Sequence, residues 1–308
     1  MIYLDYNATT PVDPRVQNAI TEALLEFGNP SSSHLYGKRA RLIMDTARTN
    51  VARLIDARHG EIIFTSGGTE ANNLAIIGTA LRYGRGHIIT SSIEHPSVLN
   101  PCRYLEENGF SVTYLPVSPE GVVDPDDVVN AIRKDTILVT IMHANNETGV
   151  IQPISEIGKI VMEKGITFHT DAAQSIGKIP TSVEELNVSM LTIVSHKFYG
   201  PKGIGALYIR TGTEIKPLLH GAGHETGLRP GTENIPGIAG LGKAAEIVLS
   251  EANEWRQKIA QLTEKLLNAL LSIEGTKLNG HRSFRLPNTI NISIKDIQGD
   301  ELVMRLSD

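Results

Sequence analysis

The chain has 308 residues, of which 41% are hydrophobic, a formal net charge of −5 and one cysteine. This composition is ordinary for a globular protein and excludes collagen, a coiled coil and a largely disordered chain. The net charge is too weak to indicate binding to nucleic acid or to an acidic membrane surface, and one cysteine excludes an internal disulfide. At roughly 150 residues per domain, the length suggests about two domains.

The first residues and the hydrophobic runs indicate a cytoplasmic protein. The opening MIYLDYNATT has no basic cluster and no apolar stretch, so we do not expect a signal peptide. No apolar run approaches the ~18 residues that a membrane span needs. We therefore expect no contact with a membrane and no direct contact with nucleic acid.

Short apolar runs alternate with amphipathic stretches along most of the chain, after two expected helices over residues 13–27 and 37–55. This alternation predicts a mostly parallel sheet with crossover helices, in which ligands bind outside the carboxyl ends of the strands. Strands are predicted over 61–65, 87–91, 111–115, 137–143, 167–171, 191–195 and 205–209, with helices over 70–83, 97–108, 124–134 and 154–164.

The last quarter of the chain has a different pattern. Residues 234–273 are almost continuously helical in pattern, a length that predicts a bent or broken helix crossing between domains. A strand-like segment over 289–294 and a helix starting at Asp300 follow. We therefore place a domain boundary near residue 250.

The first candidate site follows the strand over 61–65, where Gly67, Gly68 and Thr69 lead into a helix. The N–H groups at a helix N-terminus bind phosphate well, and glycine lets the backbone approach the ligand. A plain strand-to-helix turn with Thr69 as N-cap is the alternative, because neither the Walker nor the dinucleotide pattern is present.

Three more polar side chains lie at the ends of predicted strands. His95 could act as an acid–base group, stack on an aromatic ligand, or only cap a helix. Asp171 ends an apolar strand, so its carboxylate needs a partner, either a protonated pyridine nitrogen or a structural Lys or Arg. Lys197 could form a Schiff base with a carbonyl, or stay solvated as we expect for Lys202.

Taken together, these features indicate a pyridoxal phosphate site. A phosphate cradle, a stacking histidine, a pyridinium partner and a Schiff-base lysine are the parts such a site needs. A metal site is not indicated, because neither HExxH nor CxxC spacing occurs and His224-Glu225 lacks a second histidine four residues on.

Several motifs, which follow one another along most of the chain, resemble those of a known family. They are YLDYNATTP (3–11), FGNPSS (27–32), FTSGGTEANN (64–73), EH (94–95), HANNETG (143–149), HTDAAQSIGK (169–178), HKFYGPKG (196–203) and GAGHETGLRPGTEN (221–234). With them the chain resembles the cysteine desulfurases of the nitrogen-fixation and iron–sulfur-cluster type. These are fold type I pyridoxal phosphate enzymes of the class-V aminotransferase family.

The resemblance implies an α/β fold with a large, mostly parallel sheet covered by helices on both faces, plus a smaller α+β domain. The expected division is an N-terminal segment (1–15) that joins the small domain, a cofactor-binding large domain (16–250) and a partial C-terminal small domain (251–308). The family's motifs also imply a homodimer.

The resemblance also implies roles for the residues around the ring of pyridoxal 5'-phosphate. Lys197 would form the Schiff base, and Asp171 would pair with the pyridine nitrogen. Gln174 would hydrogen-bond the phenolic oxygen, and His95 would stack on the ring and assist proton transfer. Asn146 would lie near the ring and the substrate carboxylate.

Other residues are expected on the phosphate. Gly68, Thr69 and His196 would hold it, while Thr232 would reach the phosphate of the partner subunit. The family usually has Ser-x-His-Lys, but Val194 occupies that serine position here. Either Ser195 replaces the serine or a hydrogen bond worth roughly 0.5–1.5 kcal/mol is lost.

The family's nucleophilic cysteine and substrate-binding arginine would both lie beyond Asp308. We therefore expect a chain that is truncated before its catalytic loop, with a naturally short homologue as the alternative. Cys102 is expected to be a structural, buried cysteine on a helix.

The predicted function is a cysteine desulfurase that converts L-cysteine to L-alanine and a persulfide, for iron–sulfur cluster or thio-cofactor synthesis. A sulfur-acceptor or cluster-scaffold protein is the expected partner. The alternatives are a C–S or selenocysteine lyase that needs no cysteine, and an inactive homologue that only binds the cofactor.

Overall fold

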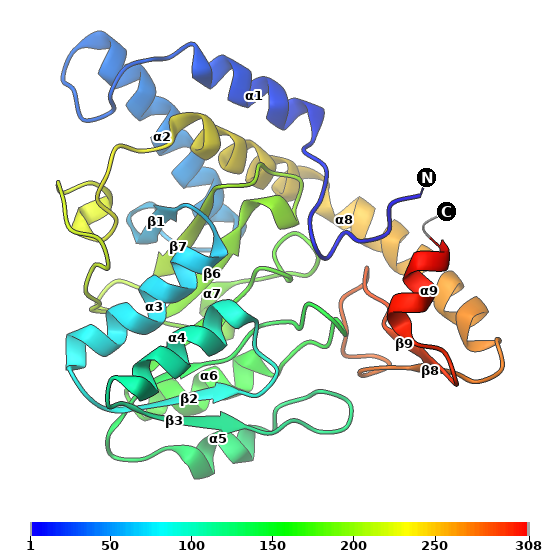
Figure 1. The fold of residues 1–308 in the computed structure, drawn as a ribbon. Helices are drawn as coiled ribbons and strands as arrows, with labels where there is room; N and C mark the ends of the chain where they lie inside the picture. The colour runs from blue at the N-terminus through cyan, green and yellow to red at the C-terminus, as the bar shows by residue number, and fades with distance from the viewer. Residues whose placement is uncertain (1, 307–308) are drawn as a thin grey trace.

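A computed structural model describes residues 2–306 and shows a central sheet between two layers of helices (Figure 1). Seven strands lie in the order β1-β7-β6-β5-β4-β2-β3, and all run parallel except β7, which is antiparallel to both of its neighbours. They are β1 (Ile62–Thr65), β2 (His87–Ser91), β3 (Ser111–Leu115), β4 (Thr136–Thr140), β5 (Thr167–Asp171), β6 (Met190–Val194) and β7 (Gly205–Ile209).

Helices cover both faces of this sheet, so the predicted architecture is confirmed. Every residue of β2, β4, β6 and β7 is buried, as expected for strands covered on both sides. Helices α3 and α4 pack on one face, whereas α2, α6 and α8 pack on the other. The helices are α1 (Pro14–Leu24), α2 (Leu35–Leu54), α3 (Gly68–Tyr83), α4 (Pro96–Glu107), α5 (Pro125–Ala131), α6 (Ile154–Glu163), α7 (Val183–Leu186), α8 (Ile235–Leu271) and α9 (Gly299–Leu306).

The bent or broken helix expected over 234–273 is not broken, because α8 is one continuous helix of 37 residues. Its first half is packed closely against α2, where a Cβ on Gly242 would lie 2.4 Å from the Cβ of Ala47. Beyond Ala252 only Leu267 is buried, and the sequence there holds no glycine or proline. The helix therefore leaves the core without an internal stop signal and stays intact.

A smaller unit lies beside the far end of α8 (Figure 1). It contains the antiparallel pair β8 (Thr276–Leu278) and β9 (Ile292–Ile294), followed by α9. The N-terminal segment joins it, because Asn7 Nδ2 donates to the Thr289 hydroxyl at 3.1 Å and Asn7 Oδ1 accepts from Asn288 Nδ2 at 3.1 Å. Within residues 2–306, no helix is both long and apolar enough to span a membrane.

A buried ion pair anchors the loop that precedes α8. Arg48 and Glu225 are 8% and 7% exposed, and Arg48 Nη2 donates to Glu225 Oε1 at 2.5 Å. Glu225 Oε2 also accepts from the backbone N–H of Phe64 at 2.7 Å, and Arg48 donates to the carbonyl of Ile62. The pair thus fixes the loop to the edge strand β1.

Replacing Arg48 by methionine should lower the free energy of unfolding by about 3 kcal/mol, because Glu225 then stays buried without a counter-charge. Urea denaturation followed by circular dichroism measures this loss. The matched control is Arg15→Met, which breaks the more exposed pairs with Glu251 and Asp13 and should cost about 1 kcal/mol or less. Equal losses in the two variants would contradict the expected difference between buried and exposed pairs.

Candidate active site

A cavity of about 520 Å³ lies at the carboxyl ends of β5 and β6. It collects side chains from separate parts of the chain, including the N-terminal segment, the start of α3, the start of α4 and the turn after β6. Of the predicted site residues, all except Ser195 and Thr232 line it, namely Gly68, Thr69, His95, Asn146, Asp171, Gln174, His196 and Lys197.

Asp171 is the last residue of β5 and is 7% exposed. Its Oδ1 accepts from the backbone N–H of Ala173 at 2.9 Å, and its Oδ2 accepts from Asn72 Nδ2 at 2.7 Å. Both donors are neutral, and Asp171 forms no ion pair among residues 2–306. A buried carboxylate without a cation fits a cationic ligand group, because burial of an unpaired charge is costly.

Lys197 ends the 3₁₀ turn that follows β6, and its amine points toward the N-terminal segment. Lys197 Nζ donates to the carbonyls of Asn7 at 2.5 Å and Ala8 at 2.9 Å. Burial lowers the pKa of Lys197, while the nearby charge of Asp171 acts in the opposite direction. A lysine whose pKa is lowered is more readily neutral, and the neutral amine is the nucleophile in Schiff-base chemistry.

Helix α3 presents its N-terminus to the cavity through Gly68 and Thr69. The preceding residue, Gly67, has a φ of +150°, which favours glycine, and a Cβ there would meet nothing within 4 Å. Free N–H groups and the positive end of the helix dipole therefore face open space suited to a phosphate.

Burial and the charge of Lys197 lower the pKa of His196 to about 4, so this residue is neutral at pH 7.

The structure corrects the prediction that Ser195 takes the place of the family's phosphate-binding serine. Val194 lines the cavity, and its Cγ2 would lie 2.6 Å from a Cβ on Gly68. Ser195 is fully buried and does not line the cavity, and its Oγ would lie 2.0 Å from a Cβ on Gly200. Val194 is the last residue of β6 and Ser195 is the first of the 3₁₀ turn, so the chain changes conformation between them and the two side chains face different surroundings.

Thr232 is exposed and lies outside the cavity. Its predicted contact with the phosphate of a partner subunit concerns a second chain, and it stays a prediction.

His95 is the N-cap of α4, and its Nδ1 accepts from the backbone N–H of Ser97 at 3.1 Å. The same Nδ1 lies 2.7 Å from Ser97 Oγ.

Glu94, which precedes His95, is 5% exposed, and Glu94 Oε1 accepts from Ser91 Oγ and from the backbone N–H of Met142. Burial raises the pKa of Glu94 to about 8, so this carboxyl group favours its neutral form at neutral pH.

Sequence reasoning gave no role to Asn7, Asn72 and Lys178, although each lies inside one of the quoted motifs. Asn7 and Asn72 line the cavity. Lys178 Nζ donates to Gln174 Oε1 at 2.5 Å, and Gln174 Nε2 donates to the carbonyl of Asn7 at 2.9 Å. A motif signals that its residues matter, but only the tertiary contacts show what each one touches.

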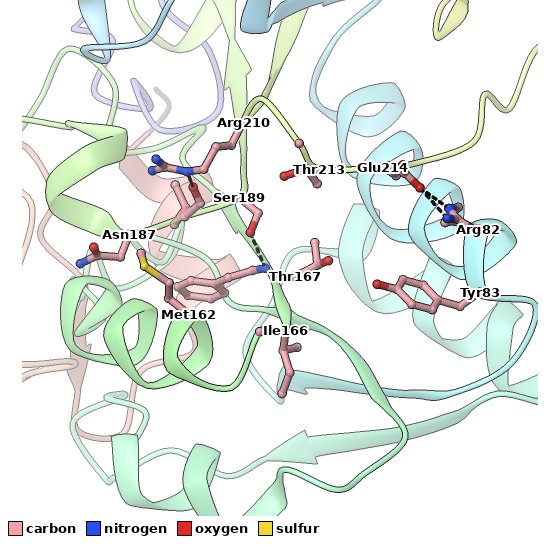
Figure 2. A pocket seen from close by; sticks show the side chains of 14 residues that line it. Arg82, Tyr83, Met162, Ile166, Thr167, Asn187, Ser189, Arg210, Thr213 and Glu214 are labelled. Carbon is pink, nitrogen blue, oxygen red and sulfur yellow. Dashed lines mark hydrogen bonds and ion pairs between the residues drawn. The ribbon is translucent and has the colours of Figure 1, made fainter.

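A second cavity of about 460 Å³ lies at the amino ends of β5 and β6 (Figure 2). Its charged side chains already have partners, since Arg82 pairs with Glu214 and Arg210 pairs with Glu184. Ligands of open α/β sheets bind at the opposite, carboxyl end of the strands. Because of this position and its paired charges, we do not assign the second cavity as an active site.

No group of three or more His, Cys, Asp or Glu side chains that could hold a metal occurs in the described part of the chain.

Cys102 lies on α4 and is fully buried, packed between α3 and the sheet. Burial raises the pKa of its thiol to about 12, so the thiolate that attacks sulfur does not form at neutral pH. We expect Cys102→Ala to keep kcat within about twofold and to lower the free energy of unfolding by about 1 kcal/mol. Steady-state kinetics and urea denaturation test this pair of effects, and loss of activity in a folded Cys102→Ala variant would contradict it.

Comparison with known proteins places this fold and site in a class. Residues 2–308 match the family model Aminotransferase class-V, and the chain belongs to this family. Its large sheet and helices are those of the fold type I enzymes, and its cofactor is pyridoxal 5'-phosphate.

Individual relatives are also similar over nearly the whole chain. A cysteine desulfurase IscS from Dictyoglomus turgidum is 52% identical over 309 residues, which cover 99% of this chain and 78% of the relative. A solved NifS-like protein superposes with a TM-score of 0.96 at 42% identity, covering 99% of this chain and 85% of that one. A structure of SspA in complex with cysteine has a TM-score of 0.89 at 42% identity, covering 100% and 86%.

The cavity fits the cofactor in size and in chemistry. A volume of about 520 Å³ lies in the range of small-molecule sites. The α3 N-terminus suits the phosphate, the unpaired carboxylate of Asp171 suits a protonated ring nitrogen, and Lys197 suits the carbonyl carbon.

Proposed function

We propose that this protein is a pyridoxal phosphate-dependent cysteine desulfurase, which converts L-cysteine to L-alanine and transfers the sulfur to an acceptor thiol. One observation carries this proposal. The cavity brings Lys197, Asp171 and His95 together in a chain that is 52% identical to a relative named cysteine desulfurase IscS.

The residues around the cavity divide into three groups by what each would hold. Gly68, Thr69 and His196 would hold the phosphate, with Thr232 serving the partner subunit. Asp171 would keep the ring nitrogen protonated, Gln174 would donate to the phenolic oxygen, and His95 would cover the ring. Asn146 would lie beside the substrate carboxylate, while Ser195 takes no part.

When bound, the cofactor supplies an electrophilic carbon for the substrate amine and a ring that accepts electrons from the substrate. Lys197 takes and returns the α proton, because its amine lies where burial lowers its pKa. The carbonyls of Asn7 and Ala8 hold that amine when it carries a proton. Two hydrogen bonds from neutral donors hold the Asp171 carboxylate in place.

The sulfur leaves by attack of a thiolate on the sulfur of L-cysteine. The acceptor thiol becomes a persulfide, the bond between Cβ and sulfur breaks, and a proton on Cβ completes L-alanine. The buried Cys102 cannot supply this thiolate, so another thiol must reach the cavity mouth. We propose a sulfur-acceptor or cluster-scaffold protein of iron–sulfur or thio-cofactor synthesis as the final recipient.

A cytoplasmic homodimer is the proposed form of the protein. Exposed apolar side chains gather around the turn between α1 and α2, where Leu24, Leu25 and Phe27 are 64%, 76% and 78% exposed. The rings of Phe27 and Tyr36 lie 4.8 Å apart in the same region. Exposed apolar clusters of this kind are typical of subunit contacts.

The test supplies purified protein with pyridoxal 5'-phosphate, L-cysteine and excess dithiothreitol as the thiol. We expect L-alanine and sulfide in equal amounts, at a rate that depends on the thiol. Pyruvate and ammonia in place of alanine would indicate a C–S lyase. A protein that binds the cofactor but releases neither sulfide nor alanine would be an inactive homologue.

A further inference from the structure

Asn72 lies on α3 and donates hydrogen bonds to two residues of the site, Asp171 and Ser97. It is fully buried and lines the cavity, one helical turn after Gly68 and on the same face of the helix. Its Nδ2 lies 2.7 Å from Asp171 Oδ2 and 2.8 Å from Ser97 Oγ. Sequence reasoning assigned this residue no role.

The chemistry of the neighbours decides which way the amide points. An ionised carboxylate only accepts hydrogen bonds, so the atom beside Asp171 Oδ2 must be the NH₂ group and not the amide oxygen. The amide oxygen is buried and has no partner in the described structure. Both hydrogens of Nδ2 are thus used, one on Asp171 and one on Ser97.

Ser97 continues the chain of contacts to His95. Since its hydroxyl oxygen accepts from Asn72, its own hydrogen is free to point at His95 Nδ1, 2.7 Å away. The backbone N–H of Ser97 donates to the same nitrogen at 3.1 Å. A continuous path of three hydrogen bonds therefore joins Asp171 to His95 through one amide and one hydroxyl.

We propose that Asn72 is a positioning residue. It holds the Asp171 carboxylate directly and the His95 ring through Ser97, so that the two groups stay in fixed positions relative to each other. The inference rests on the proposed function, in which Asp171 faces the ring nitrogen of the cofactor and His95 faces the ring. One buried side chain then sets both the charge partner of the ring and the group that covers it.

The donor from Asn72 also affects the proton at the ring nitrogen. A carboxylate that accepts fewer hydrogen bonds holds a shared proton more tightly. Without Asn72, the proton between Asp171 and the ring nitrogen should therefore move toward Asp171. The ring would then accept electrons less well, because a neutral pyridine is a weaker electron sink than a protonated one.

The test measures the ring nitrogen directly, in holoenzyme loaded with pyridoxal 5'-phosphate that carries ¹⁵N in the ring. Asn72→Leu keeps the branched shape and the number of non-hydrogen atoms and removes both donors, while Ser97→Ala cuts only the branch to His95. We expect the ¹⁵N signal of wild type to be that of a protonated pyridine. Asn72→Leu should move it toward the neutral value, and Ser97→Ala should leave it unchanged.

Affinity for the cofactor gives a second readout. Because Asn72 holds Asp171 in position for the ring nitrogen, Asn72→Leu should raise the dissociation constant of pyridoxal 5'-phosphate about tenfold, as loss of a residue that orients a ligand-binding group typically does. The matched control is Asn73→Leu, because Asn73 lies next on α3 and its Nδ2 donates within the helix to the Thr69 carbonyl. This control should keep both the wild-type signal and the wild-type affinity.

An unchanged ring nitrogen signal in folded, loaded Asn72→Leu would overturn the proposal, and so would an equal shift in Ser97→Ala. If Asn72→Leu does not fold, as judged by circular dichroism, Asn72→Ala is measured with the same two expectations. None of these readouts needs turnover. Failure of the proposed function would show instead as wild-type protein that forms no alanine from L-cysteine.

Discussion

Replacing Lys197 by alanine is expected to lower kcat on L-cysteine by at least about 10⁴-fold, because one side chain both bonds the cofactor and moves the α proton. The amine lies in the cavity, held by the carbonyls of Asn7 and Ala8, and among residues 2–306 no other lysine lines that cavity. The Lys197→Ala variant should also lack the visible absorbance of the purified holoenzyme. Steady-state kinetics and an absorption spectrum measure the two effects.

Lys202 offers the matched control for this variant. It lies five residues further along the same loop and is exposed. Lys202→Ala should keep the absorbance and a kcat within about twofold of wild type, as expected for a surface substitution. A Lys197→Ala protein that retains its colour after dialysis and still releases sulfide would assign the cofactor bond to another residue.

Asp171→Asn should lower kcat/KM by about 10²–10³-fold, the range typical for loss of one preorganised electrostatic group. The asparagine keeps the shape of the side chain but removes the charge that the cavity otherwise leaves without a cation. The ring nitrogen then loses the partner that keeps it protonated. Kinetics with L-cysteine at saturating cofactor separate this effect from weaker cofactor binding.

Glu94→Gln is the control for the loss of a carboxyl group in the same region. Burial raises the pKa of Glu94 to about 8, so below that pH the side chain is neutral and glutamine reproduces it. Its oxygen can still accept from Ser91 and from the N–H of Met142. At pH 7 we expect activity within about threefold of wild type, as for a neutral replacement of a neutral group. A loss as large as that of Asp171→Asn would refute the assignment of the charge to Asp171.

Most of the sheet could be predicted because its strands are short apolar runs between clear turn signals. The strands predicted over 87–91, 111–115, 167–171 and 205–209 have these same bounds in the structure. The strand over 137–143 ends earlier, at Thr140, although the backbone N–H groups of Ile141 and His143 still donate to the carbonyls of His169 and Asp171 on β5. Periodicity detects an element more reliably than its ends.

Helix α8 and Ser195 show where reasoning from local sequence fails. Length alone predicted a bent or broken helix over 234–273, yet close packing on α2 and a second half without glycine or proline keep α8 continuous. A hydroxyl beside the family's usual position suggested that Ser195 binds phosphate, yet its side chain turns toward Gly200. In both places the neighbours in space decided the outcome.

The sequence by itself determined the fold class, the family and the types of residue that carry the chemistry, and its one cysteine already raised the question of which thiol accepts the sulfur. Each of these depends on local pattern, which the chain carries in its order. Only the tertiary structure decided that Val194 faces the cavity, that Cys102 is buried, and that Asn72 joins Asp171 to His95. Those facts depend on side-chain direction and on contacts between segments far apart in the chain, and the physical reason is that burial and hydrogen bonding arise only after the segments pack together.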